Sequence, residues 1–306
     1  MGYFRHDAAT WAGYATATAT RTVADYTRTD LKPEFDPKKF GMRESRNSAL
    51  NPKATPLILG LDDTGSMGRV VEAMRRAMGT LLGEIIERKP IPDPHVMAIA
   101  VGDFDCDHAP IQATQFEADS TVIAKQVEEL WLEGGGGGND YEGYLGPLYL
   151  AAMRTDTDAI REGRKGFIFT VGDEEPQKVL KASSVKQFFG DTIQRDLKAE
   201  ELIDLVRRNG WEYYHLMVAE GSHMRYYDKD VKKAWTQLLG QRAILLTDHT
   251  KMAEVITSIL EVAGGKDADV VAKTWSGKTS LVVRDAIGGL AKGMADGRAL
   301  KGPRTL

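Results

Sequence analysis

Cysteine, net charge and long apolar runs are all scarce in this chain. Cys106 is its single cysteine in 306 residues, so neither an internal disulfide nor a metal site built from paired thiolates can form. The 40 Lys and Arg residues nearly balance the 44 Asp and Glu residues, which gives no indication of nucleic acid or a membrane surface as a partner. No apolar run reaches the roughly 18 residues of a membrane span, and the amino-terminal stretch lacks the apolar core of a signal peptide. We therefore expect a cytoplasmic protein.

Between residues 55 and 263, short apolar runs alternate with amphipathic segments. Such alternation is typical of a parallel sheet whose strands are covered by helices on both faces. Five runs are expected to form strands of this sheet: LILGL (57–61), VMAIAV (96–101), GFIFTV (166–171), YYHLMVA (213–219) and AILLT (243–247).

Two helices and one reversed strand complete this pattern. Apolar residues recur at helical spacing within residues 70–85 and again within 252–263. The segment IQATQFE (111–117) follows the second apolar run too closely for a crossover helix, so it should pair antiparallel with that run. The predicted fold class is therefore α/β: a doubly wound, mostly parallel six-stranded sheet with one antiparallel edge strand and helices on both faces.

The segments that flank this pattern lack a sustained period. Residues 1–54 are rich in Thr, Ala and charge, and we predict an amino-terminal arm there, suited to docking on a partner or on another subunit of an oligomer. From Gly264 the chain becomes rich in Gly and Lys, which predicts a carboxyl-terminal tail over residues 264–306 with one helix around 279–292. The domain itself is expected over residues 55–263.

The loop that leaves the first predicted strand carries oxygen ligands. In LILGLDDTGSMG, the residues Asp62, Thr64 and Ser66 occupy alternating positions, so one carboxylate and two hydroxyls can converge. A small cation such as Mg²⁺ takes about six oxygen ligands and keeps waters where the protein supplies too few. Because hydroxyls are neutral, such an ion keeps positive charge and attracts a further anion. In open α/β sheets these loops lie at the carboxyl ends of the strands, where ligands usually bind.

This loop resembles the first metal-binding motif of von Willebrand factor A (VWA) domains, Asp-x-Ser-x-Ser, with Thr64 in place of the first serine. The resemblance extends over about residues 56–263, and it implies a Rossmann-like VWA fold with a metal ion-dependent adhesion site (MIDAS). The third motif of that family is an aspartate at the end of the fourth strand, and GFIFTVGDEEP supplies Asp173 there.

The second motif of the family is a threonine that follows a Gly-rich turn and opens a helix, and this chain departs from it. LWLEGGGGGNDYEGYLGPLYLAA contains the turn and the helix but no threonine. Asn139 or Asp140 is expected to stand in, with Glu142 a more distant alternative. If Asp140 coordinates directly, a third carboxylate joins the site and affinity for an acidic partner should fall. Gly-rich turns without threonine look similar to the intracellular and prokaryotic branches of the family.

Two further motifs permit other interpretations. GDFDCDH (102–108) places alternating aspartates just past the second strand, but it lacks the Gly turn and the distal Glu of a calcium loop. AKTWSGKT (272–279) matches a loose phosphate-loop pattern, yet too few residues follow it for the rest of a nucleotide-binding sheet. We interpret the first as a solvated acidic loop and the second as a chance match.

The sequence favours a function that is not enzymatic. The leading prediction is a protein-binding module that holds Mg²⁺ or Mn²⁺, with an Asp or Glu of a protein partner completing the ligand shell. The alternative is a structural protein with a degenerate metal site that builds a larger assembly. A Mg²⁺-dependent phosphohydrolase of the haloacid dehalogenase type is disfavoured, because its Asp-x-Asp motif requires a general acid where Thr64 stands. The expected metal ligands are Asp62, Thr64, Ser66, Asn139, Asp140 and Asp173.

Overall fold

The computed structural model, which describes residues 30–64, 67, 69–131, 133 and 139–290, is organised around a six-stranded sheet. Its strands are β2 (Thr55–Asp62), β3 (Pro94–Val101), β4 (Ile111–Ala113), β7 (Gly166–Gly172), β11 (Trp211–Val218) and β12 (Ala243–Leu246). The strand order is β12-β11-β7-β2-β3-β4, and neighbouring strands run parallel except for the antiparallel pair β3 and β4 at one edge. This arrangement confirms the predicted VWA-like α/β fold class.

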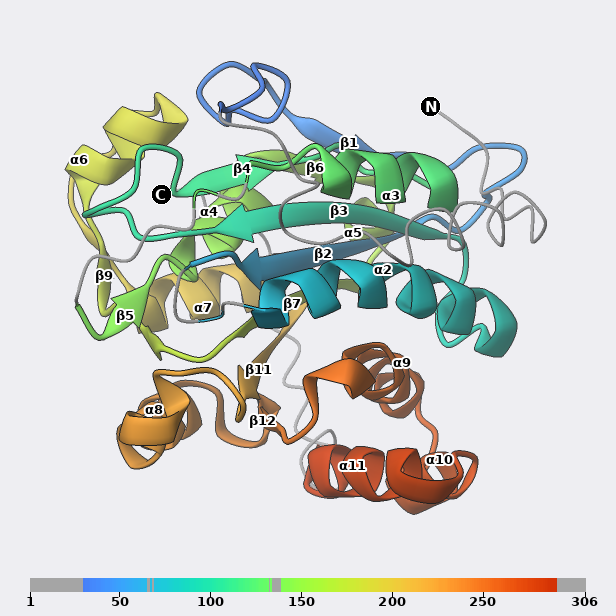
Figure 1. Ribbon diagram of the computed structural model, residues 1–306. Coiled ribbons are helices and arrows are strands. Elements are labelled where there is room, and N and C mark those ends of the chain that lie inside the picture. Colours follow the sequence, from blue (N-terminus) through green and yellow to red (C-terminus); the bar gives the residue numbers. More distant parts are fainter. Residues whose placement is uncertain (1–29, 65–66, 68, 132, 134–138, 291–306) are drawn as a thin grey trace.

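The two faces of the sheet bury different side chains because successive residues of a strand point to opposite sides. On β2, Leu57 and Leu59 belong to one hydrophobic cluster, whereas Ile58 belongs to the other. The first cluster includes residues of α2 (Arg69–Arg88), α3 (Ser120–Glu128) and α9 (Met252–Ala263), together with the carboxyl-terminal helices described below. The helices that contribute to the second are α4 (Leu145–Met153), α7 (Ala199–Arg208) and α8 (Met224–Leu239). Helices therefore cover both faces, as Figure 1 shows.

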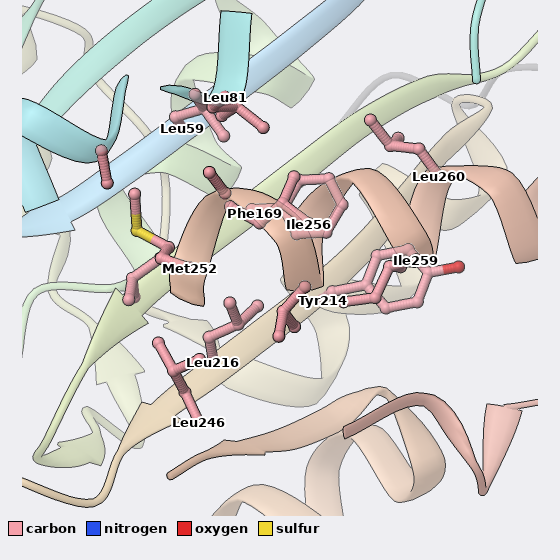
Figure 2. Close-up of a cluster of buried hydrophobic side chains, with 14 of the residues drawn as sticks. Leu59, Leu81, Phe169, Tyr214, Leu216, Leu246, Met252, Ile256, Ile259 and Leu260 are labelled. Atoms are coloured by element: carbon pink, nitrogen blue, oxygen red, sulfur yellow. The ribbon is translucent and has the colours of Figure 1, made fainter. Parts of the chain in front are cut away.

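Helix α9 has the apolar face that its sequence predicts. Met252, Ile256 and Ile259 are fully buried, and Figure 2 shows them facing the sheet residues Phe169 and Leu216. The helix runs between the first face of the sheet and the carboxyl-terminal helices (Figure 1). This packing holds the loop after β12 at the carboxyl edge of the sheet.

The described part of the amino-terminal flank is attached to the domain. Strand β1 (Arg43–Ser45) pairs in parallel with β6 (Thr155–Thr157). The Arg43 guanidinium is buried, donates a 2.9 Å hydrogen bond to the carbonyl of Ala113, and lies 3.5 Å from the ring centroid of Phe40. Strand β1 and Arg43 thus attach this part of the flank to the domain. The remainder of the predicted arm lies outside the described residues.

The described part of the carboxyl-terminal flank is packed as well. It forms α10 (Ala268–Lys273) and α11 (Gly277–Ile287), the second of which overlaps the helix predicted around 279–292. Val271, Val283 and Ile287 are buried in the same hydrophobic cluster as α9. These buried side chains attach both helices to the rest of the described structure. The domain boundaries predicted from the sequence stay predictions.

No described helix is both long enough and apolar enough to cross a membrane.

Short elements gather around the carboxyl edge of the sheet and between the helices. The two-stranded pairs are β5 (Tyr141–Glu142) with β8 (Glu175–Pro176), which are parallel, and β9 (Val179–Leu180) with β10 (Leu197–Lys198), which are antiparallel. The short helices are α5 (Asp158–Arg161), α6 (Ala182–Ser184), the π-helix η2 (Val185–Phe189), and the 3₁₀ helices η3 (Gly240–Arg242) and η4 (His249–Lys251).

Candidate metal centre

Asp62 is the last residue of β2 and the centre of a buried polar cluster. Its side chain is fully buried. Thr64 turns back onto it: the Thr64 amide and hydroxyl donate to Oδ1 of Asp62 at 3.0 and 2.5 Å. The next loop residue, Asp63, donates its amide to the Val101 carbonyl at the end of β3, which holds the start of the loop against the sheet. Ser66, the third predicted ligand of this motif, lies outside the described residues.

Tyr144 occupies the other oxygen of Asp62. Its hydroxyl donates a 2.6 Å hydrogen bond to Oδ2 of Asp62, and the whole side chain is buried. Tyr144 is the residue that immediately precedes α4, the helix that follows the Gly-rich turn. The hydroxyl at the opening of this helix therefore comes from a tyrosine rather than from the threonine of the VWA motif. Tyr144 was not among the predicted ligands, although it is the hydroxyl residue that directly precedes the predicted helix.

Asp173 directly follows β7 and lies near Asp62 in the same buried cluster. It is fully buried, and the amide of His223 donates to its Oδ2 at 2.9 Å. Gly221 packs so closely on it that an added Cβ would collide with the Asp173 carboxyl group. The carboxyl of Asp173 also raises the pKa of Asp62, second only to burial. Thr64 thus contacts Asp62 directly, and Asp173 acts on Asp62 through its charge.

Glu142 is the third acidic group of this cluster. It is buried, and its Oε2 has no hydrogen-bond partner among the described residues. Burial, and then the charge of Asp62, raise the pKa of Glu142 far above its ordinary value. For Asp62, burial and the neighbouring Asp173 raise the pKa to about 7. The charged groups that act most strongly on both carboxyls are acidic, so the cluster concentrates negative charge.

Asn139 and Asp140, the predicted replacements for the family threonine, point elsewhere. The Asn139 amide donates a 2.6 Å hydrogen bond to Asp103. Asp140 is exposed and lines a pocket of about 550 Å³. Neither has a contact with Asp62 in the described structure. Because successive residues of β5 face opposite sides, Glu142 is the member of this segment that is turned toward the buried cluster.

The aspartates of GDFDCDH form a bonded loop rather than an open cation site. Asp103 is buried and accepts from the amide of Asp105, and Asp107 accepts from the amide of Asp103. Asp105 forms an ion pair with Lys181 at 2.6 Å. These contacts use the carboxylate oxygens that a calcium ion would need. The interpretation as an acidic loop beside the centre is consistent with this geometry.

The residues of the centre fit a divalent cation. All of its candidate ligands are oxygen atoms, which Mg²⁺ and Mn²⁺ prefer over softer donors. Asp62, Thr64 and Asp173 would hold the ion, and Glu142 lies beside them with an oxygen that is free to bind a metal-bound water. Burial of several carboxyl groups close together is costly, and a cation bound among them would lower that cost.

No protein-family model and no curated protein matches this sequence. Solved structures that are similar include the pilus adhesin SpaC from Lactobacillus rhamnosus GG, at 12% identity and a TM-score of 0.46 over 74% of this chain and 32% of that one. Proximal thread matrix protein 1 from the mussel byssus, in a form with a zinc-occupied MIDAS motif, matches at 9% identity and a TM-score of 0.44 over 72% and 49%. BatB from Bacteroides thetaiotaomicron matches at 18% and 0.33 over 54% and 66%. This chain thus spans about a third of the adhesin and about half of the matrix protein.

Proposed function

We propose that this protein is a divalent-cation-dependent protein-binding module of the VWA type. In this proposal Mg²⁺ or Mn²⁺ is held by Asp62, Thr64 and Asp173, with Ser66 from the same loop. An Asp or Glu of a partner protein then binds the ion and completes its shell. The observation that carries the proposal is the group of buried oxygen atoms at the carboxyl end of β2, where Asp62 bonds to Thr64 and is acted on by the charge of Asp173.

Glu142 decides whether such a centre can accept an acidic partner. If three carboxylates surrounded a divalent ion, the centre would be negatively charged and would repel a further carboxylate. In the metal-free protein, burial and Asp62 strongly raise the pKa of Glu142, so in this proposal Glu142 enters the centre as a protonated acid. Asp62 and Asp173 then balance the two charges of the ion, and the approach of a partner carboxylate is not opposed by net charge.

The site does not favour catalysis. The position at which a phosphohydrolase of the haloacid dehalogenase type needs its general acid is occupied by Thr64, whose hydroxyl is bonded to Asp62. Among the described residues, the groups that act on Asp62 include the Tyr144 hydroxyl, whose pKa burial and Asp62 raise well above its ordinary value, and the carboxyl of Asp173. We therefore assign the ion a binding role.

A structural assembly protein with a degenerate site is the second candidate. The observation in its favour is the hydrogen bond from Tyr144 to Asp62, which satisfies one carboxylate oxygen without an ion. Under this alternative, assembly would not respond to divalent cations. Assembly through the amino-terminal arm and a cytoplasmic location stay predictions of the sequence.

Calorimetric titration of Mg²⁺ and Mn²⁺ into chelator-treated protein tests the metal. We expect saturable binding in the wild type, and loss of it in Asp62→Ala and Asp173→Ala. Asp285→Ala serves as the matched control, because the Asp285 side chain is 64% exposed on α11. Circular dichroism confirms that each variant is folded. If the wild type binds neither ion, the degenerate-site alternative takes precedence.

Binding of acidic peptides tests the partner chemistry. Immobilised peptides that contain Asp or Glu should retain the protein in Mg²⁺ and release it in chelator. Matched peptides with Asn or Gln in the same positions should not retain it. Retention that is equal on both peptide sets, or equal in chelator, would argue against a metal-mediated carboxylate contact.

A further inference from the structure

A second group of potential metal ligands lies at the ends of β11 and β12. These strands pair in parallel with Val218 opposite Leu246. The amide of Ala219 continues the ladder by donating to the Leu246 carbonyl at 3.0 Å. Glu220 and Asp248 stand at the same distance beyond the paired residues, so the register brings their loops together.

His249 joins these two carboxylates. One ligand atom from each of Glu220, Asp248 and His249 lies within 4.8 Å of the other two. Both the ring nitrogen Nδ1 and the main-chain amide of His249 contact Oε2 of Glu220, the amide at 2.8 Å. Asp248 is buried, whereas the Glu220 side chain is 42% exposed. The group is therefore anchored on one side and open to solvent on the other.

The two carboxylate oxygens of Asp248 have different partners. Contacts to Oδ1 fix the orientation of the side chain, and Oδ2 faces a cationic group. Its Oδ1 accepts from the amide and the hydroxyl of Thr250, at 3.1 and 2.6 Å. Its Oδ2 binds the ammonium group of Lys278 at 2.6 Å. A second contact that fixes the orientation of a ligand in this way is typical of protein metal sites.

Lys278 shows that this position attracts positive charge. It extends from the first turn of α11, and its side chain is 74% exposed although its ammonium group sits on Asp248. The charge of Glu220 also acts on it. Two carboxylates thus act on one lysine with a long flexible side chain. Its ammonium group can move into solvent, and another cation can then bind in its position.

We propose that Glu220, Asp248 and His249 form a binding site for a divalent transition-metal ion of the Zn²⁺ type, with Lys278 as the competing internal cation. Two carboxylates and one imidazole are ligands that Zn²⁺ accepts readily, whereas Mg²⁺ favours oxygen atoms alone. The metal would bind Oδ2 of Asp248 and replace the proton between His249 and Glu220. Ligands at about 2.1 Å from one ion are at most about 4.2 Å apart, so the three ligand atoms, which lie within 4.8 Å of one another, need only small movements to share one ion. Water would fill the remaining coordination positions.

This site is separate from the candidate centre at Asp62 but adjoins it. Gly221 directly follows Glu220 and packs on Asp173, and the amide of His223 binds the same carboxyl. An ion at Glu220 would therefore fix the segment that positions Asp173. It would also release Lys278 and with it the first turn of α11.

Zinc titration of the Asp62→Ala variant tests the proposal without a contribution from the first centre. We expect one Zn²⁺ per chain by calorimetry, and perturbation of the His249 imidazole resonance on binding. Affinity should fall by at least about tenfold in Asp62→Ala protein that also carries His249→Gln or Glu220→Gln. Lys278→Met should instead raise the affinity, because it removes the competing charge.

The matched control is His108→Gln. His108 pairs with Glu133 through Nδ1 and Oε1 at 2.9 Å, but in the described part of the chain no third ligand group converges on that pair. This variant should bind Zn²⁺ as the Asp62→Ala background does. Zinc binding that survives both His249→Gln and Glu220→Gln, or the absence of zinc binding in the background, overturns the proposal. Neither outcome bears on Mg²⁺ binding by the wild type.

Discussion

The hydroxyl of Tyr144 donates a 2.6 Å hydrogen bond to Oδ2 of Asp62 at the buried carboxyl end of β2. Gly172 makes this contact possible, because an added Cβ there would collide with the Tyr144 hydroxyl and crowd Asp62. The Tyr144 ring is held by Trp235, whose ring centroid lies 5.4 Å away. A rigid aromatic side chain thus carries the hydroxyl that reaches Asp62 from the start of α4.

Removal of this hydroxyl should destabilise the metal-free protein. At pH 8, where Asp62 is mostly ionised, Tyr144→Phe should lower the free energy of unfolding by about 1.5–3 kcal/mol, the usual value of a hydrogen bond to a charged group. In saturating Mg²⁺, the difference in unfolding free energy between the wild type and Tyr144→Phe should become smaller, because the ion supplies positive charge to the same carboxylate. Urea unfolding with and without Mg²⁺ measures both effects. Tyr149→Phe removes a hydroxyl bonded to the partly exposed Asp191, and its effect should not depend on Mg²⁺.

Glu142→Gln should leave Mg²⁺ binding little changed, because glutamine has the shape of the protonated acid. Calorimetry should measure the Mg²⁺ affinity of this variant and of Asp140→Asn, so that the buried Glu142 is compared with the exposed Asp140. Both should bind as the wild type does, in contrast to Asp62→Ala. A large loss of affinity in Glu142→Gln alone would mean that Glu142 binds as an anion. The centre would then be negatively charged, and an acidic partner would be the wrong expectation.

The metal-free protein should become less stable as the pH rises from about 4 to about 7. Burial and Asp173 raise the pKa of folded Asp62 from 3.8 to about 7. Between these values the folded state holds a proton that the unfolded state has lost, so deprotonation favours unfolding. Denaturant unfolding in chelator across this range measures the slope, and Asp62→Asn should reduce it. Mg²⁺ should oppose the decline, since it binds the deprotonated form. An identical slope in Asp62→Asn would contradict the assignment.

Gly221→Ala should abolish Mg²⁺ binding, because its Cβ would displace the carboxyl of Asp173. The matched control is Gly83→Ala within α2, where an added Cβ meets nothing within 4 Å. Alanine should stabilise that helix by about 0.5–1 kcal/mol and leave metal binding intact. Calorimetry and thermal unfolding of the two variants separate the steric effect from a general response to alanine. Normal Mg²⁺ affinity in Gly221→Ala would show that Asp173 is not a ligand.

The carboxyl-terminal helices should contribute to the stability of the domain. Val283→Ala truncates a fully buried side chain of α11 and should cost about 1–3 kcal/mol of unfolding free energy. Leu281→Ala on the same helix changes a side chain that is 51% exposed, and its effect should stay within about 0.5 kcal/mol. Equal effects of the two substitutions would mean that α11 behaves as a detached tail.

Much of the fold follows from local patterns of the sequence. The apolar runs that begin at Leu57, Val96 and Gly166 are strands of the sheet, and the segment from Ile111 forms the antiparallel edge. Parallel strands end at one edge of a sheet, so the sequence placed Asp62 and Asp173 at the same edge, and the pairing of β2 with β7 makes their strands neighbours. The flanks were harder to predict, because Arg43 and Val283 are isolated residues whose burial depends on distant partners.

The remaining features of the sites depend on tertiary contacts. Spacing suggested Asn139 or Asp140, but the pairing of β5 with β8 turns Glu142 toward the buried cluster, and the start of α4 brings Tyr144 to Asp62. No motif joins Glu220 to His249, since the register of β11 and β12 is what brings them together. Sequence by itself therefore determined which strands and loops carry the chemistry, because apolar periodicity is a local property. Only the tertiary structure decided which side chains meet, because strand register and helix packing join residues that are far apart in the chain.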